Sequence, residues 1–502
     1  MLLSRLLDGV SVLQSTVCFD GEGSRDREIA DVRCSTRGEL TDCIYVCIRG
    51  AKTDGHLFAQ AAQEKGAAVI VAEQDTGAAN QILVADSREA YALLCANLFG
   101  NPARELRLAA VTGTNGKTSV ATTIKRLLCF AGVRAGLIST IQAEYGERVV
   151  QLENTTPDAH VLHELFRAMR DEGIDTVVME ASSHALDQKR LFGLHFCVAV
   201  FTNLTQDHLD YHKSMVEYFG AKKKLFGMTD FAVVNTDDPY GRQLVSELAV
   251  PYAAYSIEDP SAAYFADEIE CGETGVQFTL AIASGGPDGT VRSRASFGIP
   301  GLYSVHNALA AAAACMRLGL PADTVLAGLR QAGAIRGRNE VIETGMGFRV
   351  ICDFAHTPDG LENILRSTRQ YAKGRIVLLF GCGGDRDRGK RPQMGRIAAQ
   401  YADFLIVTSD NPRTEQPGAI IGDILRGVPA GTAYIVIADR HEAIRYALAT
   451  ARRDDTVILA GKGHEQYQIL GDKKIAFDER TLVKGILKSL EFFHSLWYGN
   501  GN

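Results

Sequence analysis

Val111-Thr-Gly-Thr-Asn-Gly-Lys-Thr-Ser119 is a glycine-rich loop that follows a strand-like run, 106–111, and opens a helical stretch through Cys129. Strand, loop and helix in this order are the context of a phosphate-binding P-loop, in which backbone N–H groups face the phosphates. Lys117 can reach the terminal phosphates, and the hydroxyl of Thr118 can hold Mg²⁺. The strict pattern requires glycine at position 111, where this chain has valine. The loop therefore predicts a nucleotide-binding α/β domain with a phosphate loop of a particular subtype.

The composition is that of an ordinary globular protein with several domains. At about 150 residues per domain, 502 residues predict about three domains. The hydrophobic content of 46% and the charged content of 23% are typical of soluble proteins. The net charge is −7, and no basic run is longer than Lys222-Lys223-Lys224. These values predict no nucleic-acid partner.

The chain shows no pattern typical of export or of a membrane span. No stretch approaches the 18 or so apolar residues that a spanning helix needs. The first residues lack the apolar core and cleavage site of a signal peptide. The eleven cysteines are scattered and form no C-x-x-C pair, so reduced buried thiols are the better interpretation than a metal or redox site. We expect a cytoplasmic protein.

Strands alternate with helices along most of the chain, which predicts an α/β fold of three domains. The predicted units are an α/β N-terminal module at 1–104, a central P-loop-type domain with a parallel sheet at 105–335, and a C-terminal Rossmann-like domain at 336–502. Gly100-Asn-Pro102 is a stop signal at the first boundary. Buried strands are predicted at 106–111, 175–179, 196–201, 231–234, 349–352, 375–380, 404–407, 434–437 and 456–459.

Polar residues follow many of these strands, at the sheet edge where ligands bind in open α/β domains. Glu180 comes directly after one strand, and His208 follows another. Each has a plain structural explanation when taken alone, since a carboxylate at a strand end is often a solvated cap. Lys222, in a lysine run, would by itself be read as part of a solvated helix face. The residues alone leave these roles open.

Seven motifs in a fixed order resolve the ambiguity. They are T-G-T-N-G-K-T-S at 112–119, M-E-A-S-S-H at 179–184, T-N-L-T-Q-D-H-L-D-Y-H at 202–212, H-N-A-L-A-A at 306–311, G-R-N-E at 337–340, D-F-A-H-T-P at 353–358 and D-N-P-R-T-E at 410–415. In order and spacing the series resembles the Mur ligases, ATP-dependent enzymes that add amino acids to a UDP-N-acetylmuramic acid precursor of peptidoglycan. The resemblance covers nearly the whole chain.

The resemblance implies an ATP and Mg²⁺ site. Thr118 and Glu180 would hold one Mg²⁺, and His208 and a carbamylated Lys222 would hold the other; with Lys117, these side chains form the expected catalytic set. Carbamylation turns an ammonium into a carboxylate-like group. The residues expected to bind ATP are Gly113, Thr114, Asn115, Gly116, Lys117, Thr118, Ser119, Asn307, Arg338 and Asp353. His356 shares a loop with the last of these, and the resemblance implies no clear role for it.

The resemblance also implies a site for the UDP-muramoyl-peptide. The family pattern D-S-R … G … D-G-H has its counterpart in Ser35-Thr-Arg37, Gly50 and Asp54-Gly-His56. Serine replaces aspartate at position 35, so one carboxylate of the expected uridine contacts is missing. The residues expected to bind this substrate are Ser35, Thr36, Arg37, Asn154, Thr155, Thr156, Ser182 and Arg190.

Asp410-Asn-Pro-Arg-Thr-Glu415 bears on which amino acid is added. A capped turn would explain Asp410, Asn411 and Pro412, but not Arg413. Its guanidinium suits a carboxylate, the group that distinguishes diaminopimelate from lysine, and D-N-P-R resembles the diaminopimelate-adding members of the family. The expected diaminopimelate residues are Arg386, Asp410, Asn411, Pro412, Arg413, Gly461 and Glu465.

The prediction is thus a monomeric ADP-forming ligase that acts on small molecules. It would join meso-diaminopimelate to the D-glutamate side-chain carboxylate of UDP-N-acetylmuramoyl-L-alanyl-D-glutamate through an acyl phosphate. Three alternatives stay open at this point: a Mur ligase that adds lysine, a ligase like folylpolyglutamate synthetase, and a nucleotide-binding regulator without catalysis. The intact Lys117, Glu180, His208 and Lys222 argue against the regulator.

Overall fold

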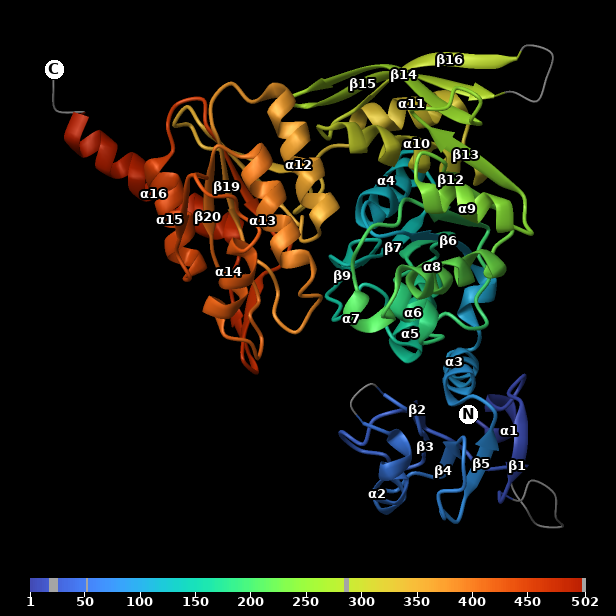
Figure 1. Cartoon of the computed structure of the whole chain (residues 1–502). Coiled ribbons are helices and arrows are strands. Elements are labelled where there is room, and N and C mark those ends of the chain that lie inside the picture. Colours follow the sequence, from blue (N-terminus) through green and yellow to red (C-terminus); the bar gives the residue numbers. More distant parts are fainter. Residues whose placement is uncertain (18–25, 51–52, 284–288, 499–502) are drawn as a thin grey trace.

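The computed structural model describes residues 1–17, 26–50, 53–283 and 289–498. In these ranges the strands form sheets of five, eleven and six strands and one two-stranded hairpin. The three larger sheets follow one another along the chain, and each has helices against it (Figure 1). No helix within the described ranges is both long enough and apolar enough to cross a membrane.

The N-terminal sheet has the strand order β1-β5-β4-β3-β2. All neighbours are parallel except β1, which is antiparallel to β5. α3 leaves this unit and packs against α5 of the next, at the narrow connection in Figure 1. The elements are α1 (Leu3–Leu6), β1 (Val12–Ser15), β2 (Asp31–Arg33), β3 (Cys43–Val46), α2 (Ala59–Glu64), β4 (Val69–Ala72), β5 (Gln81–Val84) and α3 (Ser87–Leu98).

The central sheet has the order β16-β15-β14-β13-β12-β11-β6-β10-β7-β8-β9. Its middle, from β14 to β7, is parallel, and antiparallel strands extend it at both ends. Its strands are β6 (Arg107–Thr112), β7 (Ala135–Ile138), β8 (Ala143–Tyr145), β9 (Arg148–Val150), β10 (Thr176–Glu180), β11 (Val198–Phe201), β12 (Ala232–Asn235), β13 (Tyr252–Ser256), β14 (Tyr264–Gly272), β15 (Gly275–Ala283) and β16 (Thr290–Phe297).

The helices of this unit bury the sheet on both sides. Every residue of β10 is buried, as expected for a central parallel strand covered on both faces. The alanine-rich α10 packs on α4, because its small side chains let the two helices approach closely. The helices are α4 (Lys117–Phe130), α5 (Ala159–Asp171), α6 (Ser183–Asp187), α7 (Leu209–His212), α8 (Met215–Lys223), α9 (Pro239–Glu247), α10 (Leu302–Arg317) and α11 (Ala322–Gln331).

The C-terminal sheet has the order β17-β18-β22-β19-β20-β21, with only β17 antiparallel. A separate hairpin, β23–β24, follows it. Its elements are β17 (Glu340–Glu343), β18 (Arg349–Asp353), α12 (Pro358–Tyr371), β19 (Ile376–Phe380), α13 (Lys390–Tyr401), β20 (Phe404–Val407), α14 (Pro417–Leu425), β21 (Tyr434–Val436), α15 (Arg440–Thr450), β22 (Thr456–Ala460), β23 (Tyr467–Leu470), β24 (Lys473–Ala476) and α16 (Glu479–Tyr498).

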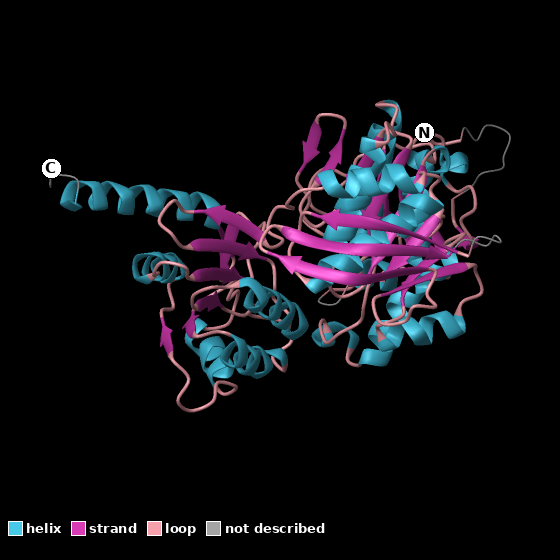
Figure 2. Cartoon of the chain, turned by 90° about the horizontal axis from the view of Figure 1, so that it is seen from above, coloured by secondary structure: helices cyan, strands magenta, loops and turns pink. Residues whose placement is uncertain are grey.

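The central and C-terminal units contact each other in at least two regions of the described chain. One is the cleft beside the phosphate loop, described below. Another is the end of the β14–β15 hairpin, where Glu273 accepts a 2.9 Å hydrogen bond from Arg349. Seen from above, the long strands of this hairpin extend towards the C-terminal lobe (Figure 2).

The predicted α/β class is confirmed, and each buried strand predicted at 105–460 lies within a residue or two of an observed strand. The central sheet is mixed rather than simply parallel, because β8, β9, β15 and β16 run against their neighbours. Domain boundaries at 104/105 and 335/336 stay our proposal.

Candidate functional site

The phosphate loop connects the carboxyl end of β6 to the first turn of α4. Gly113 and Gly116 both have positive φ, +149° and +86°. A Cβ at Gly113 would overlap the hydroxyl of Thr202, and one at Gly116 would lie 2.7 Å from Asn307 Oδ1. Both positions therefore need glycine for space as well as for conformation. α4 has no side-chain N-cap, so its first N–H groups are available to an anion.

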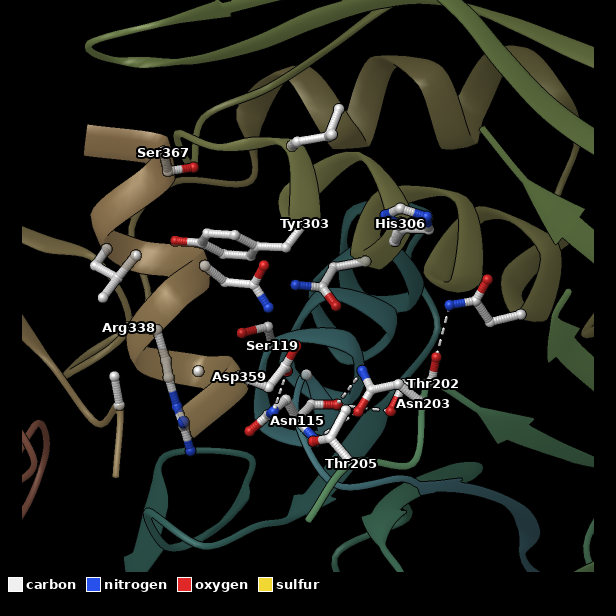
Figure 3. A pocket seen from close by; sticks show the side chains of 18 of the residues that line it. Asn115, Ser119, Thr202, Asn203, Thr205, Tyr303, His306, Arg338, Asp359 and Ser367 are labelled. Carbon is white, nitrogen blue, oxygen red and sulfur yellow. Dashed lines mark hydrogen bonds between the residues drawn. The ribbon is translucent and has the colours of Figure 1, made fainter. Parts of the chain in front are cut away.

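A cavity of about 340 Å³ opens beside this loop, between the central and C-terminal units. Figure 3 shows Asn115 and Ser119 from the phosphate loop and its helix, Tyr303 and His306 from α10, and Arg338 around it. Six of the ten residues predicted to bind ATP line it: Asn115, Gly116, Ser119, Asn307, Arg338 and Asp353. The other four belong to the same loop, so the structure brings the whole predicted set together.

Side chains of the C-terminal unit contact the phosphate loop directly. Asn115 Nδ2 donates to Asp359 Oδ2 at 2.6 Å, and Arg338 Nη2 donates to Thr118 Oγ1 at 2.8 Å. Burial raises the pKa of Asp353, whose carboxylate accepts a hydrogen bond from the Asn339 N–H at 2.6 Å. The two units are thus in direct contact beside this cavity.

Two lysine side chains converge on the carbonyl of Gly113. Lys117 Nζ donates to it at 2.9 Å and Lys222 Nζ at 2.7 Å. Lys222 is 1% exposed, and burial, followed by the charge of Lys117, holds its pKa well below the usual 10.5. A neutral amine is the form that reacts with CO₂. The environment of Lys222 therefore suits the carbamylation that the family resemblance implies.

Glu180 lies at the end of β10, fully buried. Its carboxylate accepts hydrogen bonds from Thr118 Oγ1 at 2.8 Å, from the Thr140 N–H at 2.8 Å and from Thr140 Oγ1 at 3.0 Å. A carboxylate and a hydroxyl side by side are suitable oxygen ligands for Mg²⁺. The expectation that Thr118 and Glu180 share an ion fits this geometry.

His208 has a left-handed backbone, φ +55°, at the start of α7. Such strain at a residue other than glycine is common at functional sites. Burial lowers the pKa of His208 to about 3, so its ring is neutral at pH 7 and can offer a lone pair to a metal. Among the described residues, no group of three or more His, Cys, Asp or Glu is arranged to hold a metal. The expected Mg²⁺ ligands include only two residues of those types, Glu180 and His208.

A second cavity, of about 580 Å³, lies between the N-terminal and central units. Ser35, Thr36, Arg37 and Arg190, four of the eight residues predicted for the UDP-muramoyl-peptide, line it. Ser35 uses its hydroxyl to accept the Arg37 N–H at 3.2 Å. Arg88 and Asp158 also line this cavity and were not predicted.

The remaining residues of that set connect the second cavity to Glu180. Arg190 Nη1 donates to the Thr156 carbonyl at 2.8 Å, and Thr156 Oγ1 donates to the Glu180 carbonyl at 2.8 Å and lies 3.1 Å from Ser182 Oγ. Thr155 Oγ1 lies 3.0 Å from Thr140 Oγ1, within hydrogen-bond distance. Asn154 is exposed at the start of this run. A substrate held in the second cavity can extend along this line towards the phosphate loop.

The predicted amino-acid residues gather at the carboxyl ends of β19, β20 and β22. Arg413, at φ +52°, donates through Nη1 to the Gly384 carbonyl at 2.8 Å. In the described part of the chain, neither Arg413 nor Arg386 has an ion-pair partner within 4.0 Å. Arg386 also contributes, after burial and Arg190, to lowering the pKa of His184 in the central unit. Arg386 is therefore close enough to the central unit to act on a histidine of that unit.

Several residues that hold this site together were not predicted. Asp207, inside a quoted motif, is buried between Lys390 Nζ at 3.2 Å and His356 Nε2 at 3.6 Å, across the domain cleft. In the sequence, the position of Asp207 next to His208 was the signal that could have identified it as a site residue. The β23–β24 hairpin also supports the amino-acid loop: Ile469 N donates to Asn411 Oδ1 at 3.0 Å, and Gly471 N donates to the Arg413 carbonyl at 2.8 Å.

Comparison with known proteins matches most of the chain to one family. The model of the Mur ligase middle domain matches residues 111–315, and that of the Mur ligase, glutamate ligase domain matches residues 337–463. A UDP-N-acetylmuramoyl-L-alanyl-D-glutamate–2,6-diaminopimelate ligase of Caldanaerobacter subterraneus subsp. tengcongensis is 44% identical over 475 residues, covering 94% of this chain and 97% of the relative.

Two further similarities extend over most of the chain. A protein of the same description from Clostridium tetani is 42% identical over 476 residues, covering 93% of this chain and 96% of the relative. A solved structure of a ligase so described is 30% identical, with a TM-score of 0.66, covering 95% of this chain and 98% of that one. The chain therefore belongs to the Mur ligase family.

Proposed function

We propose that this protein is an ATP-dependent, ADP-forming ligase that joins meso-diaminopimelate to UDP-N-acetylmuramoyl-L-alanyl-D-glutamate. The bond formed is an amide between the D-glutamate side-chain carboxylate and an amine of diaminopimelate. Relatives more than 40% identical along nearly their whole length carry this description. Because the reaction supplies a peptidoglycan precursor from ATP and a UDP-linked sugar, we place the protein in the cytoplasm, acting as a monomer on small molecules.

One observation carries the choice of amino acid: the Arg413 guanidinium, which lacks an ion-pair partner among the described residues and lies in the loop after β20. Lysine and diaminopimelate differ by one carboxylate, and an arginine fork matches a carboxylate with two parallel hydrogen bonds. Burial lowers the pKa of Arg413, and so does the nearby Arg386, which means that a substrate carboxylate would relieve an unfavourable concentration of positive charge. Lysine would leave both guanidiniums unpaired, at a cost in affinity.

The reaction takes place in two steps along the line of the two cavities. A D-glutamate carboxylate oxygen attacks the γ-phosphorus of ATP, the bond from that phosphorus to the bridging oxygen breaks, and ADP leaves. The amine of diaminopimelate then attacks the acyl carbon, loses a proton, and inorganic phosphate leaves with the former carboxylate oxygen. Lys117 and the open N–H groups of α4 stabilise the negative charge on the phosphates. Closure of the C-terminal unit over the cavity excludes water, which would hydrolyse the acyl phosphate.

Mg²⁺ would be held by Thr118 and Glu180 at one position and by His208 and carbamylated Lys222 at the other. Three observations support this assignment: the 2.8 Å contact of Thr118 with Glu180, the neutral His208 ring and the depressed pKa of Lys222. Bound there, Mg²⁺ would neutralise charge on the transferred phosphoryl group.

The test is phosphate release by the purified protein with ATP, Mg²⁺ and UDP-N-acetylmuramoyl-L-alanyl-D-glutamate. We expect release with meso-diaminopimelate, little with L-lysine, and none when the UDP-linked dipeptide is omitted. Mass spectrometry should find the tripeptide product. Release with lysine alone would overturn the specificity, and release with neither amino acid would overturn the function.

A further inference from the structure

The two loops that carry the amino-acid site come from strands that do not pair with each other. Residues 410–413 follow β20 and residues 461–465 follow β22, while β19 lies between these strands in the sheet. No ladder of backbone hydrogen bonds therefore joins these two strands directly, and their separation follows from the ladders that each makes with β19. Beyond the strand ends, side-chain contacts bridge the two loops.

One layer of contacts joins the loops at the level of the site. The buried Lys462 ammonium donates to Asn411 Oδ1 at 3.0 Å and to Glu465 Oε2 at 2.5 Å. Asn411 Nδ2 also donates to Glu465 Oε2 at 2.9 Å. Asn411 and Glu465 belong to the predicted site, and Lys462 lies in the same loop as Glu465.

A second layer lies beneath, outside the predicted site, and consists of one arginine. Arg440, the first residue of α15, has a fully buried side chain. Its Nη2 donates to the carbonyl of Ala460 at 2.8 Å, and its Nη1 donates to that of Ser409 at 3.4 Å. Ala460 immediately precedes Gly461, and Ser409 immediately precedes Asp410. One planar guanidinium thus binds the residue that precedes each of the two loops.

Glu479 holds this guanidinium in place from the opposite side. Its Oε1 accepts from Arg440 Nε at 2.7 Å, and its side chain is fully buried at the start of α16. The fork of three donors on one rigid plane explains why arginine occupies this position, since a lysine ammonium could not keep all three acceptors in these directions. Among the described residues, the hydrogen bond that Glu479 makes through its side chain goes to Arg440 and not to either loop, although its charge also acts on Lys462 and Asp410.

The spacing of the loops is tight at the site itself. Gly461 has φ +114°, and a Cβ there would lie 2.6 Å from Asp410 Oδ2. A small change in the distance between Ser409 and Ala460 therefore changes the positions of Asp410, Gly461 and the neighbouring Arg413. A misplacement of about 1 Å can cost roughly 10²-fold in rate.

We propose that Arg440 and Glu479 are positioning residues that set the separation of the two amino-acid loops, and with it the selectivity for diaminopimelate over lysine. This inference rests on the proposed function. It assigns no contact with substrate to either residue. The pair acts on the amino-acid loops and not on the phosphate loop, which lies in the central unit.

The experiment compares Arg440→Lys with a matched control, Arg375→Lys. Arg375 also pairs with a buried carboxylate, through Nη2 and Asp455 Oδ2 at 2.6 Å, but lies at the amino ends of β19 and β22, away from both loops. Initial rates of phosphate release give KM for diaminopimelate, ATP and the UDP-linked dipeptide, and the ratio of kcat/KM for diaminopimelate to that for lysine. Thermal melts followed by circular dichroism report folding.

For Arg440→Lys we expect KM for diaminopimelate to rise by about tenfold or more and the selectivity ratio to fall by a similar factor. KM for ATP should stay within about twofold, and Arg375→Lys should lower the melting temperature without these kinetic changes. If Arg440 had a purely structural role, both variants would have a lower melting temperature, and their KM values and selectivity ratios would be the same as each other.

A folded Arg440→Lys with unchanged KM for diaminopimelate and unchanged selectivity would overturn the proposal. If Arg440→Lys does not fold, Glu479→Gln decides the question in the same assay, because it loosens the guanidinium without removing a hydrogen bond to either loop. A raised KM for diaminopimelate in Glu479→Gln then supports the proposal, and an unchanged KM with unchanged selectivity overturns it. Wild-type protein is assayed in parallel. If it releases no phosphate with diaminopimelate, the proposed function is wrong, and this inference, which depends on that function, is wrong as well.

Discussion

Lys222 has its amine 2.7 Å from the Gly113 carbonyl, in a fully buried position next to Lys117. An ordinary surface lysine would not be found there, because burying an ammonium beside another cation is unfavourable. Its neighbour Lys223 behaves as a surface residue, 43% exposed and paired with Glu247 at 2.5 Å. Adjacent residues of the same type thus differ entirely in environment.

Lys222→Ala should lower kcat by about 10²-fold or more, since it removes a charged group from around the phosphates. If the native group is a carbamate, added formate or acetate should restore part of the activity by supplying a carboxylate in the vacated space. Lys223→Ala is the matched control and should stay within about twofold of wild type. Loss of activity without any rescue would speak against the carbamate.

In the proposed function, the choice of amino acid depends on Arg413. Arg413→Met should raise KM for diaminopimelate and reduce kcat/KM by roughly 30- to 5,000-fold, the equivalent of about 2–5 kcal/mol for losing one partner of a buried charge pair. Activity with lysine, which lacks the second carboxylate, should change little. Arg426→Met, at a side chain 71% exposed, is the control. Equal losses with both amino acids would show that Arg413 shapes the loop but does not select the substrate.

At the scale of elements, one buried arginine connects α13 and α14 to the loops of the amino-acid site. Arg391 donates to Glu415 at 2.8 and 3.0 Å, to Asp423 at 2.9 Å and to the Gly383 carbonyl at 3.2 Å. Glu415 in turn accepts the Asp385 N–H at 2.7 Å. Helix packing and loop position are therefore coupled through this carboxylate.

The Glu415 contacts predict a dependence of stability on acid. Hydrogen bonds from Arg391 lower the pKa of Glu415 from 4.5 to about 2. Because the folded-state pKa is depressed, the stabilisation is complete above pH 4.5 and is lost as the pH falls towards 2. Converted at 1.36 kcal/mol per pKa unit, it amounts to about 3 kcal/mol at neutral pH.

Glu415→Gln should therefore lower the free energy of unfolding of the C-terminal unit by about 3 kcal/mol at neutral pH. The difference from wild type should shrink as the pH decreases through the range from about 4.5 to 2, which urea titrations at several pH values can follow. Glu442→Gln, at an exposed side chain, should change neither value. If the difference in the free energy of unfolding between Glu415→Gln and wild type were the same at all pH values, the destabilisation would come from packing and not from the charge of Glu415.

At the scale of the whole molecule, the site exists only where separate units meet. The nucleotide cavity needs Asp359 and Arg338 against the phosphate loop, and Asp207 of the central unit lies against Lys390 of the C-terminal unit. The connecting segment passes through Gly337, at φ +66°, which packs against the backbone of Gly463 and His464. The connection between units is thus in direct contact with an amino-acid loop.

Gly337→Ala should impair closure more than folding. A Cβ there would overlap the backbone N of His464, so the variant should lose about tenfold or more in kcat. Gly347→Ala has the same left-handed strain, φ +80°, but its Cβ would meet only Arg453 Cγ at an ordinary 3.5 Å. Small-angle scattering with an ATP analogue should show a less compact Gly337→Ala protein, whereas equal behaviour of the two variants would exclude a role in closure.

Much of the fold was predictable because its signals are local. The buried strands at 175–179 and 404–407 are short apolar runs, and the glycines at 113 and 116 have a backbone requirement that the phosphate loop expresses within a few residues. The β14–β16 strands were missed, since their alternation is interrupted by polar residues and their pairing depends on partners elsewhere in the chain.

The sequence by itself determined the phosphate loop, the buried apolar strands and the family, because each depends on contiguous residues. Only the tertiary structure decided which distant side chains meet: Asp207 with Lys390, Thr118 with Arg338, and Arg440 with Glu479 and two strand ends. The physical reason is that a buried charge must find its partner across packed elements, and nothing in the spacing along the chain specifies that partner.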